Sequence, residues 1–231
     1  MPVLDIPSGT DGLTGYLATP ESGRGPGVVV IQEWWGVVPH IRSVADRLAQ
    51  AGFVALAPDL FRGVETTEPD EAGKVMMGLR VASAGSDIAA AAGHLASSGL
   101  LTSAQLGCVG FCMGGGLALL APTVSPGIDC TVAFYPTMPW PDYQPAWGNY
   151  SGKEALIHQC EADVPSTGPD IARYAEEISK HGGVVTVETY PGTQHAFFND
   201  DRPEVHDPRA AALAWERTID FLHRRLDGPF R

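Results

Sequence analysis

The chain has 231 residues, of which 44% are hydrophobic and 18% charged, and its formal net charge is −12. These values are typical of a globular protein with a sizeable core and exclude a disordered chain. The negative charge makes nucleic acid and anionic membranes poor partners, and no apolar run approaches the length that crosses a bilayer. The N-terminus lacks a signal-peptide pattern. We therefore expect a cytoplasmic protein whose four cysteines stay reduced.

Strands and helices alternate in the secondary structure that the sequence predicts. Apolar runs predict strands at residues 28–31, 53–57, 105–109, 129–134, 155–159 and 184–190, after two short strands within 2–20 around a turn at 9–12. Apolar spacing predicts helices at residues 40–51, 115–121, about 171–178 and from 208 onward, with a weak helix near 71–79. Ser86 is expected to cap a helix that begins at Asp87, and Pro169 to lie in the first turn of a later helix.

This alternation predicts an α/β fold with a mainly parallel twisted sheet and helices on both faces. No internal repeat and no linker divides the sequence. We expect a single domain over residues 1–231, acting as a monomer or weak homodimer.

A glycine-rich segment surrounds Cys112. Gly110-Phe-Cys112-Met-Gly114 matches the G-x-S-x-G nucleophile elbow with a thiol in place of the hydroxyl. Such a turn exposes the central side chain at the N-terminus of a helix, where the helix dipole favours the thiolate. Glycine-rich turns also cradle phosphates, but no G-K-[ST] sequence follows. A simple buried cysteine is the other interpretation.

Four residues with useful chemistry follow predicted strands: Glu33, Cys112, Asp163 and His195. In parallel sheets, ligands bind beyond the carboxyl ends of the strands. The order of thiol, acid and histidine is that of an α/β-hydrolase triad. Each residue also has a structural interpretation: Glu33 as an ion-pair partner, Asp163 as a turn residue and His195 as a loop histidine.

The chemistry assigns a role to each candidate residue. His195 would take the proton of Cys112 as a general base. Asp163 would fix the tautomer of the imidazole. The backbone N–H groups of Trp34 and Met113 would stabilise the oxyanion that forms on the substrate.

The segments G-F-C-M-G-G, Q-E-W-W-G, E-A-D and Y-P-G-T-Q-H-A-F-F-N-D resemble the dienelactone hydrolase (carboxymethylenebutenolidase) family of α/β-hydrolases. The resemblance extends from about Val28 to the final helix. It implies an α/β-hydrolase fold, a Cys112–Asp163–His195 triad and no cofactor or metal. It also implies that Glu33 engages the resting thiol until a small ester or lactone displaces it.

One departure from the family bears on the substrate. Members that act on dienelactone are expected to hold its carboxylate with arginines, one of them four residues after the histidine, where this chain has Asn199. Arg80 and Arg202 are the remaining candidates, so dienelactone itself is in question. The expected walls of the substrate pocket are Trp35, Phe111, Tyr135, Phe197, Phe198 and Asn199.

Three alternatives stay open at this point. The first is a carboxylesterase or thioesterase with a broad apolar pocket. The second is a non-catalytic binding or redox-sensing protein in which Cys112 is oxidised. The third, a metallohydrolase built on His158, Cys160 and His195, is weaker because the spacing fits no familiar zinc site.

Overall fold

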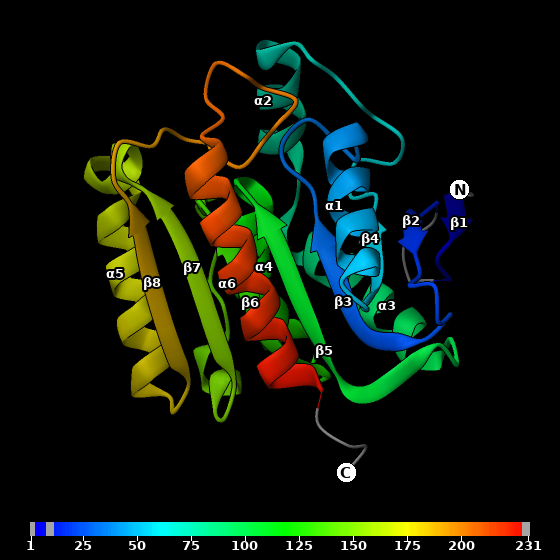
Figure 1. Ribbon diagram of the computed structural model, residues 1–231. Coiled ribbons are helices and arrows are strands. Elements are labelled where there is room, and N and C mark those ends of the chain that lie inside the picture. The colour runs from blue at the N-terminus through cyan, green and yellow to red at the C-terminus, as the bar shows by residue number, and fades with distance from the viewer. Residues whose placement is uncertain (1–2, 8–11, 228–231) are drawn as a thin grey trace.

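The computed structural model describes residues 3–7 and 12–227, which form an eight-stranded sheet in the order β1-β2-β4-β3-β5-β6-β7-β8 (Figure 1). The strands are β1 (Val3–Asp5), β2 (Thr14–Ala18), β3 (Gly25–Ile31), β4 (Val54–Pro58), β5 (Leu101–Phe111), β6 (Ile128–Phe134), β7 (Glu154–Cys160) and β8 (Val184–Tyr190). β1 and β2 pair antiparallel, and all strands from β3 onward run parallel. The mainly parallel sheet is as predicted; most of the turn expected at 9–12 lies outside the described residues.

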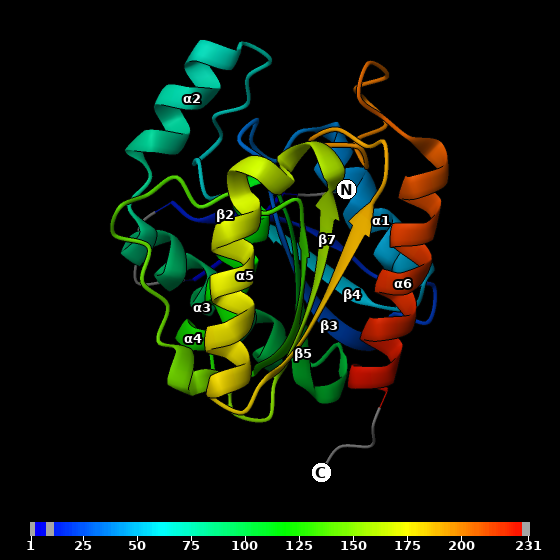
Figure 2. The same ribbon diagram turned by 90° about the vertical axis from the view of Figure 1, so that its left-hand side faces the viewer.

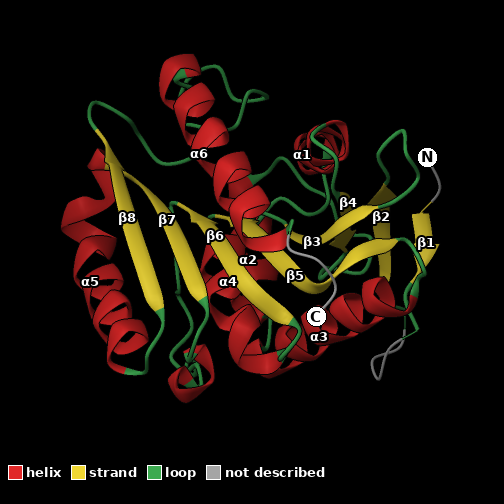
Figure 3. Ribbon diagram, turned by 60° about the horizontal axis from the view of Figure 1, so that its bottom comes forward, coloured by secondary structure: helices red, strands yellow, loops and turns green. Residues whose placement is uncertain are grey.

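Helices cover both faces of the sheet (Figure 3). They are α1 (Pro39–Gln50), α2 (Pro69–Gly78), α3 (Val81–Ser97), α4 (Met113–Val124), α5 (Val164–Lys180) and α6 (Pro208–Leu226), with short 3-10 helices η1 (Trp147–Tyr150) and η2 (Glu161–Asp163). α1 and α6 lie on one face, and α3, α4 and α5 lie on the other. Among the described residues, no helix is both long and apolar enough to cross a membrane.

β3 shows how the sequence supports two cores. Its apolar run is completely buried, as expected for a parallel strand covered on both sides. Val28 and Val30 pack into the core beneath α1 and α6, whereas Val29 and Ile31 pack into the core beneath α3 and α4. Alternation along the strand therefore supplies both layers.

Two predicted helix starts are wrong. α3 begins at Val81, and Ser86 lies inside it, where its hydroxyl donates to the carbonyl of Ala82. The apolar stripe simply extends further towards the N-terminus than the cap signal suggested. α5 begins at Val164, so Pro169 lies inside the helix and not in its first turn.

The carboxyl ends of the parallel strands meet at one edge of the molecule. α2 projects beyond this edge (Figure 2), and the loop between β8 and α6 lies at the same edge in Figure 1. Residues that follow β3, β5, β7 and β8 are thereby brought together, which is the arrangement in which α/β proteins bind ligands.

Candidate active site

Cys112 occupies a strained turn between β5 and α4. Its backbone has a φ of 55°, a value that side-chain-bearing residues rarely adopt. Its carbonyl accepts hydrogen bonds from the N–H groups of Gly115, Gly116 and Thr137, which hold the turn. Its thiol lies 3.6 Å from the hydroxyl of Thr137. Strain of this kind occurs at functional sites, where the surrounding structure maintains it.

The glycines around Cys112 are required by close backbone contacts. A Cβ at Gly114 would lie 2.3 Å from the carbonyl oxygen of Gln32, and one at Gly110 would lie 1.9 Å from that of Gly114. α4 can therefore begin directly against the end of β3. The first residue of α4 is Met113, whose N–H belongs to the helix terminus that has no intrahelical acceptor.

His195 and Asp163 form a close pair beside this turn. Asp163 ends η2, directly after β7, and His195 lies in the loop after β8. The Nδ1 atom of His195 is 2.5 Å from Oδ2 of Asp163. Burial opposes charge on both groups, but their hydrogen bond outweighs it, so the pKa of Asp163 is lowered and that of His195 is raised well above its usual range.

The imidazole of His195 also connects to the thiol. Burial alone would lower the pKa of His195, and hydrogen bonds to Asp163 and then Cys112 are the largest effects that raise it. The ring packs edge-on against Tyr135, with centroids 5.0 Å apart. Tyr135 and Ala196, like Cys112, have positive φ angles. Thiol, imidazole and carboxylate thus form one series of neighbouring groups, in which the imidazole is hydrogen-bonded to the carboxylate.

Glu33 is buried near this series, with only 1% of its surface exposed. One carboxylate oxygen accepts a hydrogen bond from the hydroxyl of Tyr135 at 3.2 Å, and the other accepts one from the side-chain amide of Asn199 at 2.8 Å. Burial and the charge of Glu33 raise the pKa of Tyr135 well above its usual value, so the tyrosine remains a donor. These two bonds, and not a bond to the thiol, account for the contacts of Glu33 within the described chain.

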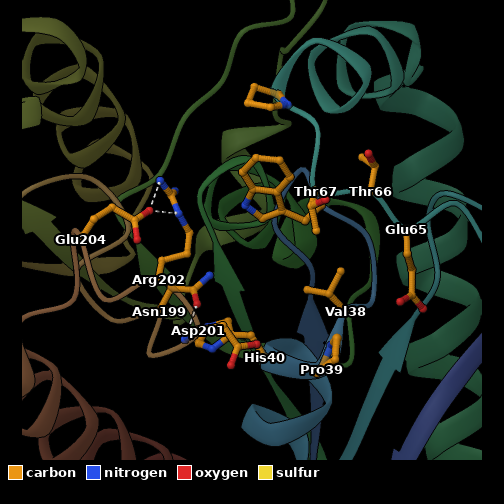
Figure 4. A pocket seen from close by; sticks show the side chains of 12 residues that line it. Val38, Pro39, His40, Glu65, Thr66, Thr67, Asn199, Asp201, Arg202 and Glu204 are labelled. Carbon is orange, nitrogen blue, oxygen red and sulfur yellow. Dashed lines mark hydrogen bonds and ion pairs between the residues drawn. The ribbon is translucent and has the colours of Figure 1, made fainter.

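A pocket of about 880 Å³ lies next to Asn199 (Figure 4). Trp35 and Asn199, both expected pocket residues, line it together with Arg202, which pairs with Glu204 on one wall. Glu65 lies on the opposite wall in Figure 4. The pocket therefore combines an apolar surface, which includes Trp35, Val38 and Pro39, with several polar and charged side chains.

The remaining expected pocket residues pack in the core. Phe111 stacks on Phe134 and Phe198, with ring centroids 4.7 Å and 5.5 Å apart. Phe197 is also fully buried, against Tyr135. Within the described chain these rings support the site from beneath and do not line the 880 Å³ pocket.

The model of the dienelactone hydrolase family matches residues 13–226. The chain belongs to this family. It is 34% identical to "Protein usf" of Aquifex pyrophilus, over 92% of this chain and 93% of that protein. It is 31% identical to a putative carboxymethylenebutenolidase of Aquifex aeolicus with the same coverage.

Solved structures agree on the fold. A putative dienelactone hydrolase from Klebsiella pneumoniae superposes with a TM-score of 0.84 at 24% identity, covering 96% of this chain and 98% of that one. The protein therefore has the α/β-hydrolase fold. As a member of the dienelactone hydrolase family, it is a hydrolase that acts on esters or lactones.

The metallohydrolase alternative named Cys160 together with His195, and these two residues do lie close together, although no role in the triad was expected for this thiol. Cys160, the last residue of β7, lies with Asp163 and His195 so that one ligand atom from each is within 4.8 Å of the others. Its position at the end of a parallel strand was the available signal. His158, which the metallohydrolase alternative used, instead bonds Thr218 and Tyr190 through its two ring nitrogens. Burial lowers its pKa to about 3, so it is a neutral core residue.

Proposed function

We propose that the protein hydrolyses small carboxylic esters or lactones through a Cys112–Asp163–His195 triad and an acyl-thioester intermediate. One observation carries the proposal: Nδ1 of His195 lies 2.5 Å from Oδ2 of Asp163, and the Cys112 thiol lies close enough to the same imidazole to raise its pKa. A nucleophile, its base and the group that orients the base are thus adjacent, as nucleophilic catalysis requires.

In the first half-reaction, Nε2 of His195 accepts the proton of the Cys112 thiol, and the sulfur attacks the substrate carbonyl carbon. The carbonyl oxygen gains negative charge and accepts hydrogen bonds from the N–H groups of Trp34 and Met113. Asp163 stabilises the imidazolium while it exists. The C–O bond of the ester then breaks, and the imidazolium protonates the departing oxygen. In a lactone, this oxygen remains attached to the acyl group as a hydroxyl.

In the second half-reaction, His195 removes a proton from a water molecule, whose oxygen attacks the thioester carbon. The C–S bond breaks, the acid product leaves, and the thiolate of Cys112 recovers a proton from His195. No redox step and no cofactor takes part.

Glu33 is proposed to control the thiol. Its carboxylate is already held by Tyr135 and Asn199 at the edge of the site. We propose that the thiolate forms only when a bound substrate rearranges this group, which would protect the thiol from oxidation between turnovers. A carboxylate so close to the site also disfavours a second negative charge there before substrate binds.

The pocket chemistry favours a substrate other than dienelactone. Asn199 stands where the family's carboxylate-binding arginine is expected, and its amide is already bonded to Glu33. Arg202 lines the neighbouring pocket, but its guanidinium is paired with Glu204. Arg80 is exposed at the start of α3. We therefore propose a neutral ester or lactone that packs against Trp35.

The test is hydrolysis of a panel that contains dienelactone, simple lactones and a short nitrophenyl ester, with intact mass recorded during turnover. Wild type should hydrolyse a neutral member fastest and carry an acyl adduct. Cys112→Ala should lose at least about 1,000-fold in rate and carry none. Cys130→Ala, which removes a buried thiol elsewhere in the sheet, is the matched control and should keep the adduct.

The outcomes separate the alternatives. Hydrolysis that survives in Cys112→Ala would contradict the triad. No hydrolysis by folded wild type, together with a peroxide-driven mass gain at Cys112, would replace the proposal with the redox-sensor alternative. Fastest hydrolysis of dienelactone would contradict the proposed preference for neutral substrates.

We also propose that the protein acts in the cytoplasm, as a monomer or weak homodimer and without nucleic acid. All four cysteines are free, a state that a reducing compartment preserves. The net charge of −12 opposes binding to polyanions. Light scattering over a range of concentrations would test the association state, and a constant tetramer would contradict it.

A further inference from the structure

The thiol of Cys160 faces the working parts of the proposed triad. Ligand atoms of Cys160, Asp163 and His195 lie within 4.8 Å of one another. The triad mechanism uses Cys112 and has no step for this second thiol. A sulfur, a carboxylate oxygen and an imidazole nitrogen therefore converge at one point without an assigned purpose.

Disulfide formation between the two thiols does not explain this arrangement. Cys112 follows β5 and Cys160 ends β7, and β6 lies between these strands. Two strand spacings amount to roughly 9.6 Å, whereas a disulfide needs Cα atoms within about 7 Å. The convergence must be explained by another kind of partner.

We propose that Cys160, Asp163 and His195 form a site for a thiophilic divalent cation, Zn²⁺ in the first instance, which inhibits the enzyme when it binds. One S, one N and one O ligand suit Zn²⁺ and do not suit Mg²⁺ or Ca²⁺, which prefer oxygen alone. Three protein ligands leave a fourth tetrahedral position for water.

The geometry needs little rearrangement. Zinc bonds of the usual length place tetrahedral ligand atoms roughly 3.3–3.8 Å apart, within the 4.8 Å limit that the three ligand atoms already satisfy. The 2.5 Å hydrogen bond between His195 and Asp163 would open by roughly 1 Å to admit the ion. The side chains of His195 and Asp163 are 33% and 15% exposed, so an ion can reach the buried sulfur from their side.

Binding would switch off the base. Zn²⁺ replaces the thiol proton of Cys160, which is released to solvent, and binds Nδ1 of His195, whose proton moves to Nε2. The neutral imidazole must then carry its proton on Nε2. That nitrogen can no longer accept the proton of Cys112, and Asp163 no longer orients the ring. The metal is therefore an inhibitor and takes no part in hydrolysis.

Binding itself is tested with Co²⁺, which reports thiolate ligation by a sulfur-to-cobalt charge-transfer band. The band should appear in wild type and in Cys112→Ala, and disappear in Cys160→Ala. Cys160→Ser, which keeps the size of the side chain, should lose it too, whereas Cys130→Ala should keep it. A band lost in Cys112→Ala but kept in Cys160→Ala, or no band in folded wild type, would overturn the proposal.

Inhibition is tested with Zn²⁺ and the best substrate of the panel, each protein compared with its own metal-free rate. Wild type should be inhibited and recover on addition of EDTA, and Cys160→Ala should need at least about tenfold more Zn²⁺. Equal sensitivity of the two proteins would overturn the proposal. This arm rests on the proposed function, but the cobalt arm does not: failure to hydrolyse any substrate would refute the function and leave the metal site to be judged by cobalt.

Discussion

Glu33 is a carboxylate that folding removes almost entirely from water. A buried charge is tolerated only when hydrogen bonds replace its hydration. Here the hydroxyl of Tyr135 and the amide of Asn199 each serve one carboxylate oxygen. The two donors come from loops after β6 and β8, so this single side chain connects three loops at the site.

Removing one donor should therefore be costly. We expect Asn199→Ala to lower the free energy of unfolding by about 2 kcal/mol, because the lost hydrogen bond served a buried charge. The same substitution in a Glu33→Gln background should lower it by roughly half as much, since the acceptor is then neutral. Urea unfolding of the four proteins measures both values. Equal losses in the two backgrounds would show that Asn199 acts independently of Glu33.

At the level of single residues, the sequence predicted which side chains follow the strand ends and that Asp163 pairs with His195, but not the other hydrogen bonds of the site. Strand-end positions brought Glu33, Cys112, Asp163 and His195 to one edge of the sheet. The sequence did not predict that Asn199 bonds Glu33 or that Cys160 faces Asp163. Both contacts depend on loop conformations, which the spacing of apolar residues does not predict. The catalytic roles themselves stay predictions until the rates of the variants are measured.

Among the secondary-structure elements, the junction of β5 and α4 is the most tightly constrained. Its position depends on the absence of side chains at Gly110 and Gly114, since backbone oxygens lie where Cβ atoms would be. Because α4 starts so close to β3, this junction determines how far the Cys112 thiol lies above the end of the sheet. A change of a single methyl group here should move the nucleophile.

Two Gly→Ala substitutions in helices should therefore have opposite effects. Gly114→Ala places a Cβ 2.3 Å from a backbone oxygen and should destabilise the protein by roughly 1–3 kcal/mol, with loss of ester hydrolysis. Gly93→Ala, at an exposed position of α3 with no atom within 4 Å of the added Cβ, should stabilise the protein by up to about 1 kcal/mol. Thermal melting and hydrolysis rates of both variants test this. A Gly114→Ala protein with wild-type activity would contradict the expectation.

The spacing of apolar residues predicted the positions of the helices and strands well, but it predicted their first and last residues poorly. β3, β6, β7 and β8 lie at or next to their predicted positions because each is a short buried run between turn residues. The start of α3 was wrong because Ser86 resembles a cap, yet packing of Val81 extends the helix. Local cap preferences are worth about 1 kcal/mol, which burial of one apolar side chain can exceed.

Across the whole molecule, an ion-pair network lies at the opposite end of the sheet from the proposed site. Arg224 and Arg225 of α6 both pair with Glu154, which begins β7, and Arg225 also pairs with Asp129 on β6. Hydrogen bonds from Arg224 lower the pKa of Glu154 below its ordinary 4.5. The network connects the last helix to β6 and β7.

Stability should therefore depend on pH in a definite direction. A lowered pKa means that the contribution of Glu154 is present above pH 4.5 and is lost as pH falls through its lowered value. The contribution of Asp163 has the same sign, starting from 3.8. The raised pKa of His195 gives the opposite sign: its contribution is complete below pH 6.5 and declines as pH rises through the raised value. These three groups together favour the folded state most between pH 4.5 and 6.5.

Melting temperatures measured at several pH values test the expected loss of stability at acid pH. Glu154→Gln should melt below wild type at about pH 6, and the gap should narrow as the pH falls through the lowered pKa of Glu154, because the wild-type carboxylate then becomes protonated. Glu176→Gln, at an exposed position of α5, is the matched control and should show no such gap. A gap that persists unchanged at acid pH would assign the effect of Glu154 to packing.

The order of the parts along the chain has a consequence for biosynthesis. The elbow around Cys112 is translated before η2, which carries Asp163, and before the loop that carries His195, and α6 follows later still. A nascent chain that has folded only through α4 holds the proposed nucleophile but lacks its proposed base. On the proposed mechanism, the thiol therefore meets its base only when β7 and β8 join the sheet. Translation order would thus delay acylation until the sheet is complete.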